Sequence, residues 1–147
     1  MALHAMRKAR HSNRALVVVS DGQDYRSIYN SPELYRAFAD SPVPIYLILT
    51  QERWSGARID PWGAPTREDL VRLANQSGGY SMSVFSNREA IEAATQLAFA
   101  IRMPYVLFFV SQWPRGADRV RELSIEVNRV RPRPRVYHRT MYYAQPH

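Results

Sequence analysis

The sequence contains no cysteine, only one lysine and no long apolar run. The lack of cysteine excludes disulfide bonds, a thiolate zinc site and a cysteine nucleophile. No apolar run approaches the roughly 18 residues that a membrane-spanning helix needs. The N-terminal residues also lack the apolar segment of a signal peptide. The chain is therefore expected to carry neither a membrane span nor a signal peptide.

Signatures of catalysis are also missing. The four histidines are scattered, and no H-x-x-x-H spacing, phosphate-binding loop, dinucleotide fingerprint or serine nucleophile elbow occurs. Ser20 stands beside Asp21, but a catalytic triad also needs a placed base. We therefore expect a protein that is not an enzyme.

What is present is one domain's worth of chain, 147 residues with 46% hydrophobic residues and a net charge of +7. Of the 20 basic residues, 19 are arginine. Such a skew can follow from GC-rich coding as easily as from phosphate binding. The clearest concentration lies between Arg115 and Arg139, where eight arginines face three acidic residues.

The hydrophobic pattern predicts a short basic helix within residues 1–14 and then three strand–helix units. Continuous apolar segments predict a strand buried on both faces at 15–19 and a second buried strand at 43–49, and a third strand is predicted at 80–85. Helix-capping patterns follow these strands at Ser31, Thr66 and Ser86. The predicted fold class is α/β, with a parallel sheet in a three-layer, Rossmann-like arrangement.

After Met103-Pro104 the hydrophobic period falls from 3.6 to 2. This change predicts three antiparallel strands, at Tyr105–Val110, Leu123–Val127 and Val136–Tyr143. The predicted organisation is an α/β unit over residues 1–103 and an antiparallel β extension, packed on it, over 104–147.

The segment Arg14–Asp24 (R-A-L-V-V-V-S-D-G-Q-D) resembles the fourth strand of von Willebrand factor type A (VWA) domains and the loop after it. The resemblance continues in order through the segments 43–46, 70–79 (L-x-x-L-A-x-x-x-G-G), 105–107, 123–127 and 139–144. The last two resemble the ending of bacterial VWFA-related proteins of the acidobacterial type. The resemblance implies a noncatalytic protein-interaction module that corresponds to the C-terminal half of a VWA domain.

In VWA domains the aspartate of S/T-D-G is one element of a metal-ion-dependent adhesion site, and Asp21 holds this position here. The D-x-S-x-S loop and the threonine of a complete site are absent upstream of Ala15. The resemblance therefore implies a partial site of Asp21, with Ser20 and Asp24, that would take Mg²⁺ or another divalent cation only if the missing half were supplied. The alternative is that Asp21 caps a βα turn through backbone amides.

Residues 50–65 form a long aperiodic segment at the same predicted edge of the sheet. Partner-binding loops lie at this edge in VWA domains, and Trp and Arg are common in binding hot spots. We expect a protein partner to contact Arg53, Trp54, Arg58 and Trp62. The alternative is that one or both tryptophans cover the core.

Two further expectations concern partners and location. The alternating arginines at 129, 131, 133 and 135, with tyrosines nearby, suggest an alternative role as a basic nucleic-acid-binding domain, although such arginines are more often a solvated face. Without a preceding strand, segment 15–19 would be an exposed edge and would promote self-association. The family resemblance suggests an extracytoplasmic location, with the export signal upstream of Met1.

Overall fold

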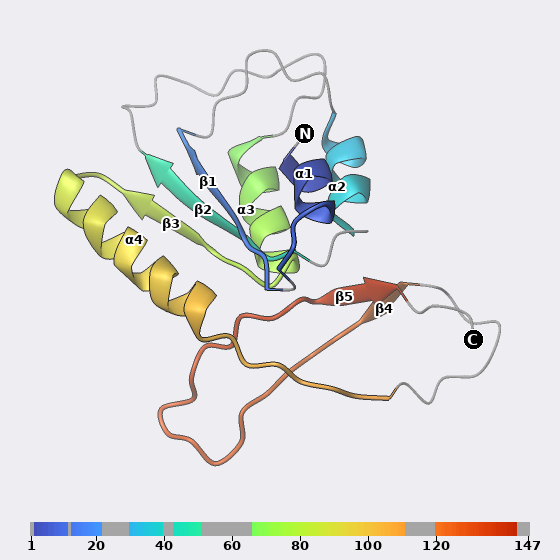
Figure 1. The fold of residues 1–147 in the computed structure, drawn as a ribbon. Helices are drawn as coiled ribbons and strands as arrows, with labels where there is room; N and C mark the ends of the chain where they lie inside the picture. The colour runs from blue at the N-terminus through green and yellow to red at the C-terminus, as the bar shows by residue number, and fades with distance from the viewer. Residues whose placement is uncertain are drawn as a thin grey trace.

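The computed structural model describes residues 2–11, 13–21, 30–39, 43–50, 66–110 and 120–143. It shows a mixed α/β fold with a three-stranded parallel sheet and a separate two-stranded antiparallel sheet (Figure 1). The helices are α1 (Ala2–Arg7), α2 (Ser31–Ala39), α3 (Arg67–Gln76) and α4 (Asn87–Arg102). The strands are β1 (Leu16–Ser20), β2 (Ile45–Thr50), β3 (Ser81–Val84), β4 (Val120–Glu122) and β5 (Met141–Tyr143).

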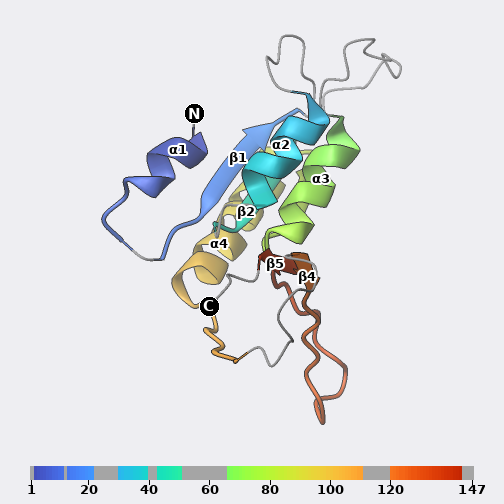
Figure 2. The ribbon, with the colours of Figure 1, turned by 90° about the vertical axis from the view of Figure 1, so that its right-hand side faces the viewer.

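Strand β2 is the centre of the fold because it lies between β1 and β3 in the parallel sheet. Its side chains alternate between two hydrophobic clusters. Ile45, Leu47 and Leu49 pack with Ala74 of α3, whereas Tyr46 and Ile48 pack with Ala93 and Leu97 of α4. Helices therefore cover both faces of the sheet, with α2 and α3 on one side and α4 on the other (Figures 1 and 2).

The three helices that follow strands all begin at side-chain caps. The capping box predicted at Thr66 is confirmed: the Thr66 hydroxyl accepts from the Asp69 amide, and the Asp69 carboxylate accepts from the Thr66 amide. Ser86 caps α4 as predicted, but Glu89 accepts from the amide of Phe85 rather than from that of Ser86. At α2 the reciprocal pair is Asn30 with Glu33, so the prediction that Ser31 is the N-cap was one residue late.

Strand β1 forms where it was predicted, but it is not buried on both faces. It is the edge strand of the three-stranded sheet, and its exposure alternates. Leu16 and Val18 pack in the cluster under α2 and α3, whereas Val17 and Val19 are 42% and 64% exposed. The register pairs Val17 with Tyr46 and Val19 with Ile48, so both valines lie on the α4 face of the sheet. In the described part of the chain, α4 covers β2 and β3 on that face and leaves β1 open.

The C-terminal tail contains less sheet than the sequence predicted. Residues 104–110 form no strand and are exposed. The segment 123–127 forms no strand either, although the Leu123 amide donates to the Thr140 carbonyl at 2.7 Å. The antiparallel sheet consists of β4 and β5, three residues each, paired from Val120–Tyr143 to Glu122–Met141. The predicted division at residue 103 stays a prediction, although α4 does end at Arg102, just before Met103-Pro104.

The tail is attached to the α/β unit at the C-terminus of α3. The Thr140 amide donates to the Gln76 carbonyl at 3.2 Å, and Arg139 forms a bridge with Ser77. Backbone carbonyls at a helix C-terminus lack partners within the helix, so the tail satisfies one of them. Gly78, with a φ of +94°, turns the chain there and leaves no space for a side chain beside Arg139.

Candidate functional site at the carboxyl edge of the sheet

Because β1, β2 and β3 are parallel, their carboxyl ends lie at one edge of the sheet. This edge is called the rim below and is defined by Ser20, Asp21, Thr50, Arg67 and Ser83. Asp21 directly follows β1, as the sequence predicted, and its side chain is half-buried. Ligand sites of open α/β sheets lie at this edge. The rim is therefore the candidate functional site.

Arg67 links two strands across the rim. Its Nη1 donates to the Asp21 carbonyl oxygen at 3.3 Å, and its Nη2 donates to the Ser83 hydroxyl at 3.1 Å. Arg67 can reach both because the Thr66 capping box starts α3 there and so places the first helical residue at the rim. The sequence analysis missed Arg67, although a basic residue next to a helix cap after a rim loop is a detectable signal.

The Asp69 carboxylate is hydrogen-bonded to neighbouring residues of α2 and of the α3 cap. Its carboxylate accepts from the Thr66 amide and hydroxyl, both at 3.0 Å, and from the Tyr35 hydroxyl at 3.3 Å. Desolvation, followed by the nearby Asp69 charge, raises the pKa of Tyr35 above its usual value of 10.0. Asp69 therefore joins α2 to α3 just below the rim.

The described residues do not fit a divalent-metal site. Among the parts of the chain that the structure describes, no group of three His, Cys, Asp or Glu side chains could hold a metal ion. A hard cation such as Mg²⁺ needs several oxygen ligands, and the Arg67 guanidinium next to the Asp21 backbone places a fixed positive charge in the same place. Ser20 and Asp21 lie at the rim as predicted, but alone they do not complete the site.

The remaining predicted site residues fall elsewhere. Asp24 and the four predicted partner contacts, Arg53, Trp54, Arg58 and Trp62, lie outside the described residues. Their assignment stays a prediction.

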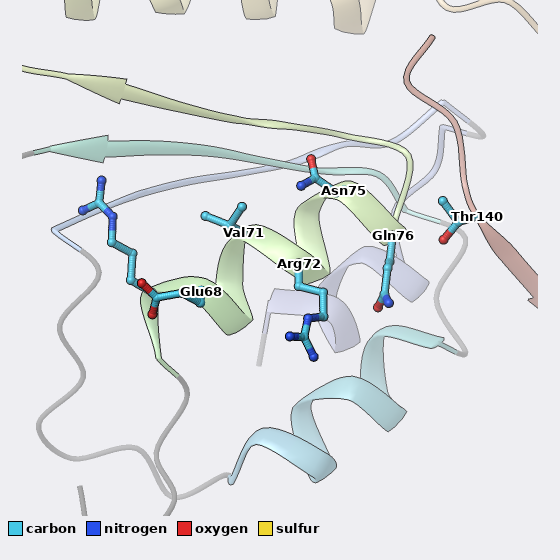
Figure 3. A pocket seen from close by; sticks show the side chains of 7 residues that line it. Glu68, Val71, Arg72, Asn75, Gln76 and Thr140 are labelled. Atoms are coloured by element: carbon cyan, nitrogen blue, oxygen red, sulfur yellow. The ribbon is translucent and has the colours of Figure 1, made fainter. Parts of the chain in front are cut away.

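A groove of about 380 Å³ runs beside α3 from the rim to the tail (Figure 3). Arg67 and Glu68 line one end of it and Thr140 lines the other. Between them the lining comes from α3 residues: Val71, Arg72, Asn75 and Gln76. Figure 3 shows Arg72 and Gln76 extending from α3 along this groove. The groove therefore continues from the rim along one side of α3, with a lining that is mostly apolar.

Comparison with known proteins does not identify a family. No family model matches the chain, and no curated protein matches it. Among solved structures, the chain is similar to an uncharacterized membrane-spanning protein from Vibrio fischeri, with 15% identity and a TM-score of 0.45. The match covers 60% of this chain and 48% of that protein, so the chain spans about half of its length. A similarity at this level carries no argument about fold family or function.

None of the helices in the described ranges has both the length and the apolar character that a transmembrane helix needs.

Proposed function

We propose that this chain is a noncatalytic protein-interaction module of the VWA type, and that the rim is its binding surface. The proposal includes a three-layer, Rossmann-like fold of the VWA type. The described residues would correspond to the second half of such a domain. Its main support is that β1 ends in Ser20-Asp21 at the carboxyl edge of a parallel sheet, beside the guanidinium of Arg67. Helices on both faces of that sheet support the same reading.

The chemistry of the rim favours a partner that is recognised without metal. Arg67 presents a planar cation that is held by two neutral oxygen acceptors and keeps further donors. A guanidinium of this kind recognises carboxylates, so an acidic side chain of a partner protein fits it best. Mg²⁺ or another divalent cation belongs to this proposal only if additional ligands come from outside the described residues.

The test begins with the immobilised chain and an extract of its source organism. Captured proteins are identified by mass spectrometry, purified and titrated calorimetrically against the chain. We expect Arg67→Gln to weaken binding by about ten- to a hundredfold, because a charge-assisted hydrogen bond contributes roughly 1.5–3 kcal/mol. EDTA should leave the affinity unchanged.

Arg102→Gln is the matched control, since Arg102 is exposed and ends α4 at the opposite edge of the sheet. Its affinity should stay within about twofold of wild type. A partner whose affinity is unaffected by Arg67→Gln, or is lowered equally by both variants, would show that the rim is not the binding surface.

A further inference from the structure

A second charged surface lies far from the rim, in the tail. The basic loop, defined as residues 128–135, carries four arginines, and all four are exposed: Arg129, Arg131, Arg133 and Arg135. Figures 1 and 2 both show that the chain between β4 and β5 extends away from the parallel sheet. The sequence predicted these arginines on a paired hairpin, whereas the structure places them on an unpaired loop.

The positive charge of the basic loop is not neutralised by neighbouring acids. Residues 127–143 contain no Asp or Glu. None of the described carboxylates forms an ion pair with the four arginines, unlike Arg88, which pairs with Glu92. Pro132 and Pro134 alternate with the arginines and restrict the backbone, which lowers the entropy lost when the loop binds a ligand. Concentrated, pre-ordered positive charge of this kind favours a polyanion.

An exposed aromatic ring stands at the end of the basic loop. The Tyr137 ring packs on Tyr80 with centroids 4.5 Å apart, and Tyr80 packs edge-on against Tyr46, a buried core residue, at 5.2 Å. The Arg135 guanidinium lies 5.1 Å from the centre of the Tyr137 ring. Tyr137 nevertheless remains 43% exposed. A ring fixed to the core next to arginines can stack an unpaired base.

We propose that the basic loop binds single-stranded nucleic acid, with its arginines on the phosphodiester backbone and Tyr137 beneath a base. Single strands are favoured over duplexes because the bases of a duplex are already stacked on one another. Anionic lipid surfaces and acidic peptides would use the arginines but not the ring. This inference is independent of the rim and of its partner.

The experiment measures fluorescence anisotropy of a labelled oligothymidylate of about 20 nucleotides, titrated with the full chain at several salt concentrations. Four phosphate contacts predict that log K falls with log[salt] with a slope of about −3. Replacing all four loop arginines by glutamine should lower the affinity by more than about tenfold and bring the slope near zero. Tyr137→Leu should lower the affinity by about fivefold or more and leave the slope unchanged.

The control variant carries the same change in net charge elsewhere. It replaces four other exposed arginines by glutamine, Arg10, Arg36, Arg88 and Arg102, and should keep both affinity and slope. Equal losses in the two quadruple variants would show that only the net charge matters and would overturn the proposal. Tighter binding to phosphatidylserine vesicles, to polyglutamate or to a duplex than to the single strand would overturn it as well. Far-UV circular dichroism of each variant verifies that the fold is intact.

Discussion

Gly79 sets how closely the end of α3 approaches the start of β2. A β-carbon at this position would overlap the carbonyl oxygen of Ile45, which is backbone of the central strand and cannot move aside. We therefore expect Gly79→Ala to lower the free energy of unfolding by about 3 kcal/mol, at the upper end of the usual cost of overpacking. Urea unfolding followed by circular dichroism measures this change.

Asn75→Ala is the control for that substitution, because Asn75 is exposed on α3, and its stability should stay within about 0.5 kcal/mol of wild type. The neighbouring Ser77 hydroxyl explains why the junction is tight. It donates to the Ala74 carbonyl at 2.7 Å and accepts from the Ile45 amide at 2.8 Å. Equal stability of Gly79→Ala and wild type would mean that α3 and β2 are farther apart than described.

Individual residues were predictable where their role is local. The Thr66 cap, the Ser86 cap and the end of α4 before Pro104 depend on nearby residues alone, and the structure confirms all three. Arg67 was not predicted because its partners, Asp21 and Ser83, are distant in sequence and meet it only after the sheet has formed. The partial metal site was inferred from a motif at Asp21 alone, whereas the basic residue beside the Thr66 cap lies 46 positions further along the chain.

At the scale of the element, β1 combines a well-packed face with an open one. Val17 and Val19 lie on the α4 face without cover from the described residues, and the outer edge of β1 has no partner strand among those residues. Open strand edges pair with other chains. We expect the chain to self-associate through β1 at tens of micromolar, with a second copy of the chain as the partner, as measured by sedimentation velocity.

Val19→Lys should shift the sedimentation profile toward the monomer, because a charge on an edge strand opposes pairing. Ile91→Lys is the matched control, since Ile91 is 69% exposed on α4, and it should sediment like wild type. A wild-type chain that stays monomeric would contradict the expectation. So would equal dissociation in both variants, because the contact would then not be specific to β1.

The strands of the tail show where sequence patterns stop being informative. The parallel strands were predictable because their apolar residues are buried by helices that the same sequence specifies. Leu123 and Ile125 are half-buried and Ser124 and Glu126 are exposed, as the period of 2 predicted, but Val127 is exposed. A strand also needs a partner in register, which a single-chain pattern does not reveal. The ladder pairs β5, which lies within the predicted strand 136–143, with β4, which directly precedes the predicted strand 123–127.

The whole molecule should be sensitive to alkaline pH through its tyrosines. Burial raises the pKa values of Tyr46 and Tyr80 above the ordinary value of 10.0. Below pH 10 both residues are protonated in the folded and unfolded states, and their contribution to stability is complete. Above a pH of about 10 the unfolded chain releases these protons at a lower pH than the folded chain does. The free energy of unfolding therefore falls as the pH rises.

This linkage predicts that the urea midpoint of the wild type decreases steadily above a pH of about 10. The double variant Tyr46→Phe/Tyr80→Phe should lose less stability over the same range, because it lacks the two raised pKa values. Tyr105→Phe serves as its control, since Tyr105 is 98% exposed, and it should follow the wild-type curve. The Tyr80 ring also packs against Tyr137, which lies next to the basic loop. Salt-dependent oligonucleotide binding should therefore be lost over the same alkaline range as the fold. Parallel alkaline curves for the wild type and the double variant would show that these tyrosines do not link the stability of the molecule to pH.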